Sequence, residues 1–333
     1  MTIQLGLLAA SRIAEEAIVE PSPLVDGVTL AAVAARDISR ARDAATRWSI
    51  PQAFGSYSEL ITSEDVDAVY IATPASLHRP WAVAAIEAGK HVLCEKPLAA
   101  NADDARRIAD AERANDVVVM EAFHWRYHPY AQQIADVLGS GALGSLQRIE
   151  AVFNIPNGEI LPDDIRFAFA IGGGSTMDLG CYPIQWVRFA ACSEPEVISA
   201  EATCPVPEID GSLRAELRWS SQLTGSVASS MIGPGDNYEV WLRVVGDRGT
   251  MFATNPLAPQ AGDAVITVES EGEPTRTIRA DRSTTYFHQL VAFRDAIELR
   301  KPFPTTADDG VRNMAVVDAC YRAAGLQPRP AAG

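Results

Sequence analysis

The sequence predicts an α/β fold in two parts: a doubly wound parallel sheet, followed by an α+β domain with a large, mostly antiparallel sheet. Three observations lead to this prediction. Up to about residue 122, short apolar runs without polar alternation are separated by helical patterns, as in parallel strands covered on both faces. After that point, longer strand-like segments follow one another with hairpin turns between them. Two helical patterns then close the sequence.

The first part has five expected strands joined by helices. Asn101 can cap one of these helices at its start, and Gly89 is a stop signal after another. Right-handed crossovers between parallel strands then give the doubly wound arrangement. The expected strands are 3–9, 28–34, 68–72, 92–94 and 117–120, and the expected helices begin near Arg12, at 39, at 81 and at 102.

The second part is expected to be mainly strands. Turns at 247–249 and 271–274 indicate hairpins. We therefore expect domains at 1–122 and 123–333, with the last helix able to pack back on the first domain. The expected strands are 146–155, 196–206, 212–219, 224–231, 239–245 and 264–269, and the expected helices are 128–138, 285–300 and 307–324.

Composition excludes several classes of partner. The net charge is −15, and no run of Lys and Arg forms a basic stripe, so we expect neither nucleic acid nor an anionic membrane as a partner. No run of 18 apolar residues is present, and the first residues lack the pattern of a signal peptide. The five cysteines are scattered without a CxxC pair, which favours reduced thiols in the cytoplasm and argues against a structural metal.

The turn after the first strand is the place to look for a dinucleotide fingerprint, G-x-G-x-x-G/A. Residues 9–14 read Ala-Ala-Ser-Arg-Ile-Ala, so both leading glycines are absent. Ala9 and Ser11 are small substitutes, and Ala14 fits the third position. Backbone N–H groups at the start of the helix can still hold phosphate, but the motif alone is weak or negative evidence.

The end of the second strand indicates which dinucleotide would bind. Ala35 stands where an acidic residue would hold the ribose of NAD, and Arg36 follows it. A guanidinium there suits the 2′-phosphate of NADP, and Arg40 or Arg12 can add charge. The alternative is that these arginines belong to a solvated helix, while Asp37 could still serve NAD.

Glu95-Lys96-Pro97 follows the strand 92–94 directly. An ionised Lys at the carboxyl end of a buried strand is costly unless it is paired or points into a cleft, and ligands bind at that edge of a parallel sheet. Lys96 is therefore the first candidate for chemistry, against the alternative of a surface Lys in a loop.

The second dense segment is 171–183, which contains three consecutive glycines, Asp178, Tyr182 and Pro183. Asp178 and Tyr182 would share a face of a continuous helix, but Pro183 suggests that the helix begins near Cys181. A Tyr near a Lys can act as a general acid or base, because the ammonium lowers the pKa of the phenol. The alternative is a core aromatic and a helix cap.

The predicted domain junction carries aromatic and polar side chains. His124, Trp125 and Arg126 can contact a sugar or an arene, or can simply pack at the junction. His78, beyond the third strand, can line a nicotinamide cleft or cap a helix. The loops near Trp125 and at 154–169 and 233–238 are expected to shape the pocket.

Taken together, these segments resemble the glucose–fructose oxidoreductase/inositol dehydrogenase (Gfo/Idh/MocA) family over nearly the whole sequence. The glycine turn departs from the family pattern, which affects the expected cofactor affinity rather than the fold. The residues that carry the resemblance are 72–74 with His78, 88–99, 121–123 with Arg126 and Pro129, 172–182 and 286–293.

The resemblance implies a Rossmann domain, a C-terminal sheet that mediates assembly into a homodimer or homotetramer, and hydride transfer between nicotinamide and a sugar, polyol or cyclic diol. It implies that Lys96 is catalytic and that Asp178 supports it. A Tyr at position 182 is similar to the pattern of the branch that contains dimeric dihydrodiol dehydrogenase and NADP-dependent D-xylose 1-dehydrogenase. We therefore expect NADP rather than NAD as the cofactor. The cofactor-binding residues expected are Gly6, Ala9, Ser11, Arg12, Ile13, Arg36, Arg40, Thr73, Pro74, His78, Glu95, Lys96 and Pro97.

Other functions stay open on the same fold. They are a non-catalytic NADP-binding regulator, a reductase of a ketose or anhydrosugar, and a glycosidase with a retained NAD. Either Tyr182 or Lys96 can transfer the proton, and we favour Tyr182.

Overall fold

The computed structural model describes residues 2–160, 163–233 and 237–330, which form two compact units. The first unit contains the chain up to Tyr127 together with Thr284–Val311, and the second contains His128–Ser283 and Arg312–Pro330. Within the described residues, no helix is both long and apolar enough to cross a bilayer. The segments 161–162 and 234–236, which belong to loops expected to shape the pocket, lie outside the described residues.

The first unit is built on a six-stranded parallel sheet with the order β3-β2-β1-β4-β5-β6. Parallel strands end at the same edge, so the turns after β1, β2, β4 and β5 lie along one side of the sheet. The five expected strands are present, and the short β3 is an addition. The strands are β1 Ile3–Leu8, β2 Val28–Ala34, β3 Gln52–Phe54, β4 Ala68–Ile71, β5 His91–Cys94 and β6 Val119–Glu121.

Helices connect these strands close to the expected positions. The segment after β1 differs, because only α1 (Arg12–Ala14) is α-helical, and a π turn (Glu15–Val19) and a 3₁₀ turn (Ser22–Leu24) follow it. Pro21 and Pro23 in this segment lack the N–H groups that a longer α-helix would need. The other helices of this part are α2 Ile38–Trp48, α3 Tyr57–Ile61, α4 His78–Glu87 and α5 Ala102–Ala114.

The expected domain boundary differs from the observed division. The first unit extends to Tyr127 rather than to residue 122, and it includes α8 (Thr285–Leu299), which the sequence-based prediction assigns to the second domain. Leu290 and Phe293 of α8 are buried in the same apolar cluster as Leu7 of β1. This burial is the physical reason for the difference, since the helix completes the core of the first unit.

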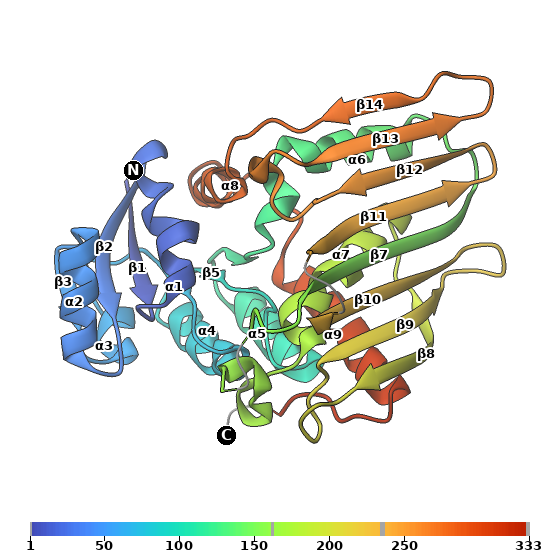
Figure 1. The fold of residues 1–333 in the computed structure, drawn as a ribbon. Coiled ribbons are helices and arrows are strands. Elements are labelled where there is room, and N and C mark those ends of the chain that lie inside the picture. The colour runs from blue at the N-terminus through green and yellow to red at the C-terminus, as the bar shows by residue number, and fades with distance from the viewer. Residues whose placement is uncertain (1, 161–162, 234–236, 331–333) are drawn as a thin grey trace. The chain divides into compact units, whose positions relative to one another are not determined.

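The second unit is built on an eight-stranded sheet with the order β14-β13-β12-β11-β7-β10-β9-β8 (Figure 1). Among the described strands of this second sheet, only β7 and β10 pair in parallel, so the sheet is mostly antiparallel as expected. The strands are β7 Leu146–Pro156, β8 Glu196–Thr203, β9 Ser212–Arg218, β10 Thr224–Gly233, β11 Glu239–Gly246, β12 Gly249–Thr254, β13 Val265–Ser270 and β14 Arg276–Arg279.

One face of this sheet is the core of the second unit. Ile149, Ala151 and Phe153 alternate along β7 and are buried, and α7 (Cys181–Ala191) packs against β7 and β10. The rings of Phe153 and Trp186 stack with their centroids 6.5 Å apart. The remaining helices are α6 Pro129–Gly139 and α9 Ala307–Ala323, the latter divided between the two units at Val311.

Candidate active site

The turn after β1 keeps a glycine-like backbone without glycine. Ala9 has a φ of 102°, a conformation that L residues rarely adopt. Ser11 follows at the N-cap of α1, and its Oγ is buried without a hydrogen-bond partner in the described part of the chain. An orphaned hydroxyl in a turn at the ligand-binding edge of a parallel sheet fits a phosphate oxygen.

Three more residues expected at this turn have different surroundings. Gly6 lies inside β1, where a Cβ would come within 2.6 Å of Leu60 Cδ2, so its missing side chain makes room for α3. Arg12 is exposed, and Ile13 packs at the margin of the apolar core. Their assignment to the cofactor stays a prediction.

The turn after β4 carries a second orphaned hydroxyl. Thr73 Oγ1 is buried and, like Ser11 Oγ, has no hydrogen-bond partner among the described residues. His78, the first residue of α4, is buried behind this turn, with Nε2 2.8 Å from the Thr73 carbonyl and Nδ1 2.9 Å from the Pro97 carbonyl. His78 therefore links the Thr73-Pro74 turn to the Lys96-Pro97 turn. This role differs from the two expected from the sequence, lining a nicotinamide cleft and capping a helix.

Two arginines stand at the end of β2. Arg36 and Arg40 are exposed, and both lie near Tyr57. Burial raises the pKa of the Tyr57 hydroxyl, and the two positive charges partly oppose that rise. Asp37 Oδ1 accepts hydrogen bonds of 2.8 Å from the backbone N–H and the hydroxyl of Ser39, which lower the pKa of Asp37. Asp37 is thus the N-cap of α2, and the guanidinium groups remain for an anionic ligand.

Lys96 lies in the turn that follows β5, next to Glu95, whose carboxylate is held by hydrogen bonds. The Glu95 carboxylate accepts hydrogen bonds from the Tyr70 hydroxyl at 2.7 Å and from the backbone N–H of Lys96 at 3.2 Å. The buried Glu121 of β6 accepts a bond of 2.7 Å from the backbone N–H of Leu98. The start of the turn that carries Lys96 is therefore held by Glu95, itself bonded to Tyr70 of β4, and its end by Glu121 of β6.

The three residues expected to contact a substrate belong to the first unit, and two of them, His124 and Trp125, are buried. Trp125 is 1% exposed, and the Arg126 guanidinium lies 5.7 Å from its ring centroid. His124 Nδ1 is 2.8 Å from Thr285 Oγ1. Burial and the charge of Lys96 lower the pKa of His124 to about 3, so the imidazole is neutral near pH 7. Trp125 thus contributes packing, and His124 contributes a neutral ring close to Lys96.

In the second unit, the three glycines lead into a helical run that carries Asp178 and Tyr182. A π turn (Thr176–Gly180) precedes α7, which begins at Cys181 as the sequence indicated. Gly173 is packed so closely that a Cβ would lie 2.5 Å from the Arg166 carbonyl oxygen. The glycines therefore serve tight backbone packing at the start of this run.

Asp178 and Tyr182 have different surroundings. Asp178 Oδ2 accepts a hydrogen bond of 2.5 Å from Arg166 Nε, and Asp178 is the main cause of the raised pKa of Arg166. Tyr182 is 4% exposed, and its ring packs against Phe153 and Trp186. Asp178 therefore has a paired, partly exposed carboxylate, whereas Tyr182 has its ring fixed in the core of the unit.

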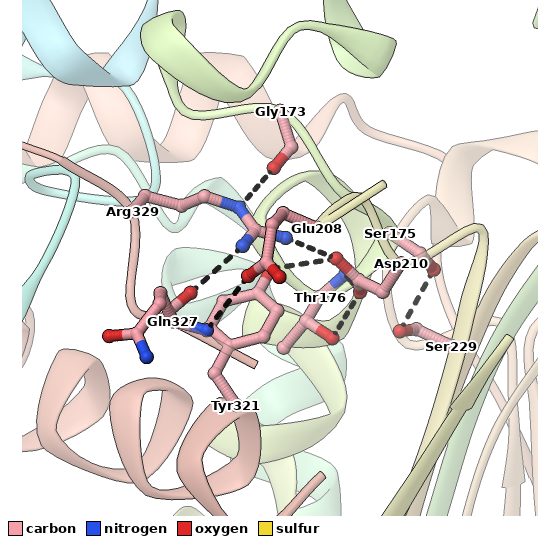
Figure 2. A network of polar contacts seen from close by, with 9 residues as sticks. All are labelled: Gly173, Ser175, Thr176, Glu208, Asp210, Ser229, Tyr321, Gln327 and Arg329. Atoms are coloured by element: carbon pink, nitrogen blue, oxygen red, sulfur yellow. Dashed lines mark hydrogen bonds and ion pairs between the residues drawn. The ribbon is translucent and has the colours of Figure 1, made fainter. Parts of the chain in front are cut away.

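Sequence reasoning missed several residues around this run. Arg166 pairs with Asp178, and the buried Asn313 donates from Nδ2 to the Cys181 carbonyl at 3.1 Å. Asp210 and Arg329 hold the residues before Asp178 (Figure 2). Arg166 lies in a short 3₁₀ turn, and the other partners lie far along the chain from the run. None of them belongs to a motif or a periodic spacing, so one sequence carries no signal for them.

With this geometry in place, family models match both parts of the chain. Residues 6–123 match the Gfo/Idh/MocA oxidoreductase model with an NAD-binding Rossmann fold, and residues 131–252 match the Gfo/Idh/MocA C-terminal domain. The chain belongs to the Gfo/Idh/MocA family of oxidoreductases. The expected resemblance, the fold class and the assignment as an oxidoreductase are therefore confirmed.

Individual members of the Gfo/Idh/MocA family are similar over most of their length. D-xylose 1-dehydrogenase (NADP⁺) 2 of Haloferax volcanii is 32% identical over 96% of both chains. Trans-1,2-dihydrobenzene-1,2-diol dehydrogenase of Xenopus tropicalis is 32% identical over 70% of both chains. The crystal structure of a 3-ketoreductase from Actinomadura kijaniata, in complex with NADP and TDP-benzene, is 25% identical over 97% of this chain and 98% of that one, with a TM-score of 0.86.

Proposed function

We propose that this oxidoreductase transfers a hydride between NADP and a carbinol or carbonyl carbon of a sugar, polyol or cyclic diol. The observation that carries the proposal is Lys96, placed at the carboxyl edge of the parallel sheet in a turn held by Glu95 and Glu121. The similar proteins that act on D-xylose and on a dihydrodiol support the substrate class.

The residues of the first unit fit NADP. The orphaned hydroxyls of Ser11 and Thr73 suit the polar groups of a dinucleotide, and Arg36 and Arg40 suit a 2′-phosphate. Asp37 is occupied as a helix cap, which removes the acidic ribose ligand that NAD would use. When bound, NADP would supply the nicotinamide ring that donates or accepts the hydride.

Proton transfer is assigned to the chain's own groups. We assign Tyr182 as the group that takes the proton from the substrate hydroxyl, with Lys96 lowering the pKa of the phenol and polarising the oxygen. Asp178 supports Lys96, and the assignment requires Lys96 and Tyr182 to act on one substrate oxygen. The reverse assignment, with Lys96 as the proton-transfer group, predicts that Tyr182→Phe retains most of the turnover.

The cofactor assignment is tested by titrating the protein with NADPH and NADH in parallel and following tryptophan quenching. NADPH should bind at least tenfold more tightly, which is about 1.4 kcal/mol. Arg36→Ala should remove most of that preference, whereas Arg47→Ala, an exposed arginine in the last turn of α2, should leave it unchanged. Binding of neither dinucleotide would contradict the proposal and would favour a non-catalytic member of the fold.

The catalytic assignment is tested with a panel of aldoses and trans-dihydrodiols with NADP⁺, and of ketoses with NADPH. Lys96→Met should lower kcat by roughly 10²–10⁴-fold, since general acid–base catalysis is worth about that much. Lys90→Met, a change of the same type before β5, serves as the control for loss of a lysine; the Lys90 ammonium donates to the Ser63 and Val66 carbonyls. More than about a tenth of wild-type turnover in Lys96→Met would contradict the assignment. Activity restricted to the ketoses would favour the reductase alternative.

We propose that the second unit carries the surface through which copies of the chain assemble into a cytoplasmic homodimer or homotetramer. The sheet face opposite α7 carries half-buried apolar side chains, Val152, Trp241 and Phe252, among charged ones. Such a face suits a second copy of the chain. None of the five cysteines, all of which lie in the described part of the chain, forms a disulfide, which fits a reducing compartment. Analytical ultracentrifugation should show an oligomer, and Trp241→Glu should dissociate it.

A further inference from the structure

A buried ion pair lies beside the glycine run of the second unit. The side chains of Asp210, which precedes β9, and Arg329, which follows α9, are both 0% exposed, with Arg329 Nη2 2.6 Å from Asp210 Oδ1 (Figure 2). Taking two charges out of water is costly, so a pair this deep is kept only where further hydrogen bonds satisfy its remaining atoms.

Asp210 holds the start of the run that carries Asp178. Its Oδ2 accepts hydrogen bonds from the Thr176 backbone N–H at 2.7 Å and from Thr176 Oγ1 at 2.6 Å. Its backbone carbonyl accepts one from the Ser175 N–H at 2.7 Å. Asp210 thus binds two successive residues, two and three positions before Asp178.

Arg329 holds the glycines themselves. Its Nε donates to the Gly173 carbonyl at 2.5 Å, and its guanidinium lies 4.0 Å from the ring centroid of Tyr321. The Tyr321 hydroxyl in turn donates to Asp210 Oδ1 at 3.0 Å. Arg329, Tyr321 and Asp210 therefore form one closed network around the backbone of residues 173–176, as Figure 2 shows.

Gly174 is fitted to this network. Its φ is +127°, and a Cβ there would lie 2.2 Å from Asp210 Oδ1 and 2.6 Å from Arg329 Nη2. Its carbonyl accepts a hydrogen bond of 3.1 Å from the Asp178 N–H. The ion pair thus binds the backbone on both sides of Gly174, at Gly173 and at Ser175 and Thr176, and Gly174 itself accepts the hydrogen bond from Asp178.

We infer that Asp210 and Arg329 are positioning residues for the reaction: they fix the backbone of residues 173–176 and thereby set the placement of Asp178 and Tyr182. This inference rests on the proposed function for the reaction itself. The hydrogen bonds of both residues reach the start of the helical run, and both act through it. Misplacement of a reacting group by about 1 Å can cost as much as 10²-fold in rate.

The test is Arg329→Lys, which keeps the charge but not the planar fork that reaches both Gly173 and Asp210. With NADP⁺ and the substrate that the wild type turns over, kcat should fall by at least tenfold. KM should change by less than threefold, and NADPH binding, which depends on residues of the first unit, should stay the same. Tyr321→Phe, which removes only the hydroxyl, is the milder variant, and its kcat should fall by at least threefold.

The control for a general loss of stability is Val268→Ala. Val268 is buried in β13, which stands five strands away from β9 in the sheet order. This variant should lower the melting temperature without a comparable loss of kcat. If the Arg329 and Tyr321 variants lose no more kcat than Val268→Ala does, the inference is overturned.

Hydrogen exchange gives a readout that needs no turnover. Amides of residues 174–180 should exchange at least tenfold faster in Arg329→Lys than in the wild type, whereas Val268→Ala should not accelerate them selectively. Unchanged exchange in this segment would also overturn the inference. A wild type without turnover on any substrate would contradict the proposed function, and the exchange result would still decide whether the ion pair orders residues 174–180.

Discussion

At the scale of single residues, the turn after β1 shows how a backbone can keep a shape that its side chains do not favour. The absence of the two glycines suggested a weakened nucleotide turn. In the structure, Ala9 nevertheless has a φ of 102°, the region in which glycine is at ease. The neighbouring strand fixes this shape, since the Ala9 N–H donates to the Ala34 carbonyl at 3.2 Å. The cost of such a conformation for an L residue is about 1–2 kcal/mol.

Ala9→Gly should therefore stabilise the protein. Relief of the strained φ outweighs the entropy that glycine loses on folding, so we expect a net gain of about 0.5–1 kcal/mol in the free energy of unfolding. Urea denaturation measures it, and NADPH should bind at least as tightly as to the wild type. The matched control is Ala10→Gly at the next position, which should destabilise instead. A loss of stability in Ala9→Gly would show that the turn is not strained.

At the scale of elements, apolar runs were enough to predict the strands of the parallel sheet and the start of α7 at Cys181. The short β3 was missed, because its three half-buried residues form no apolar run. The partners of the candidate residues were harder to predict. Asp178 is paired with Arg166 of a short 3₁₀ turn, and Asp210 with Arg329, 119 residues away. Such pairs follow from tertiary packing and leave no periodic pattern in the sequence.

The contact between α5 and β6 predicts a pH effect. Glu112 of α5 accepts a hydrogen bond of 3.1 Å from the Val119 N–H, and burial, aided by the charge of Asp308, raises the pKa of Glu112 to about 7. The folded state therefore keeps this proton up to a higher pH than the unfolded state, whose pKa is near 4.5. The contribution of Glu112 to stability is present below pH 4.5 and is lost as the pH rises through 7.

Glu112→Gln should remove this dependence, because the amide keeps an acceptor for Val119 and does not ionise. Relative to the wild type, the variant should be more stable at pH 8 than at pH 5, measured by urea denaturation at both values. Glu87→Gln, at an exposed position of α4, is the control and should show no such difference between the two pH values. An equal effect of Glu112→Gln at both pH values would contradict the prediction.

At the scale of the whole molecule, the first unit is assembled from two distant segments of the chain. Residues 284–311 complete it after the whole central sheet of the second unit has intervened. The sequence could not reveal this, because the apolar pattern of α8 is the same whichever core receives it. Local periodicity predicts that a helix forms and which side is apolar, whereas the partner of that side depends on the fold.

If α8 belongs to the core of the first unit, its most buried aromatic residue should carry much of the stability of that unit. Phe293 is 1% exposed in the apolar cluster that contains Leu7. Phe293→Ala should lower the free energy of unfolding by about 3–5 kcal/mol. Phe287→Ala is the matched control on the same helix, and its cost should be clearly smaller because Phe287 packs only at the margin of the cluster. NADPH binding to Phe293→Ala, followed during urea denaturation, should be lost at a lower urea concentration than in Phe287→Ala. Equal midpoints for the two variants would mean that α8 is not part of the core that supports the nucleotide turn.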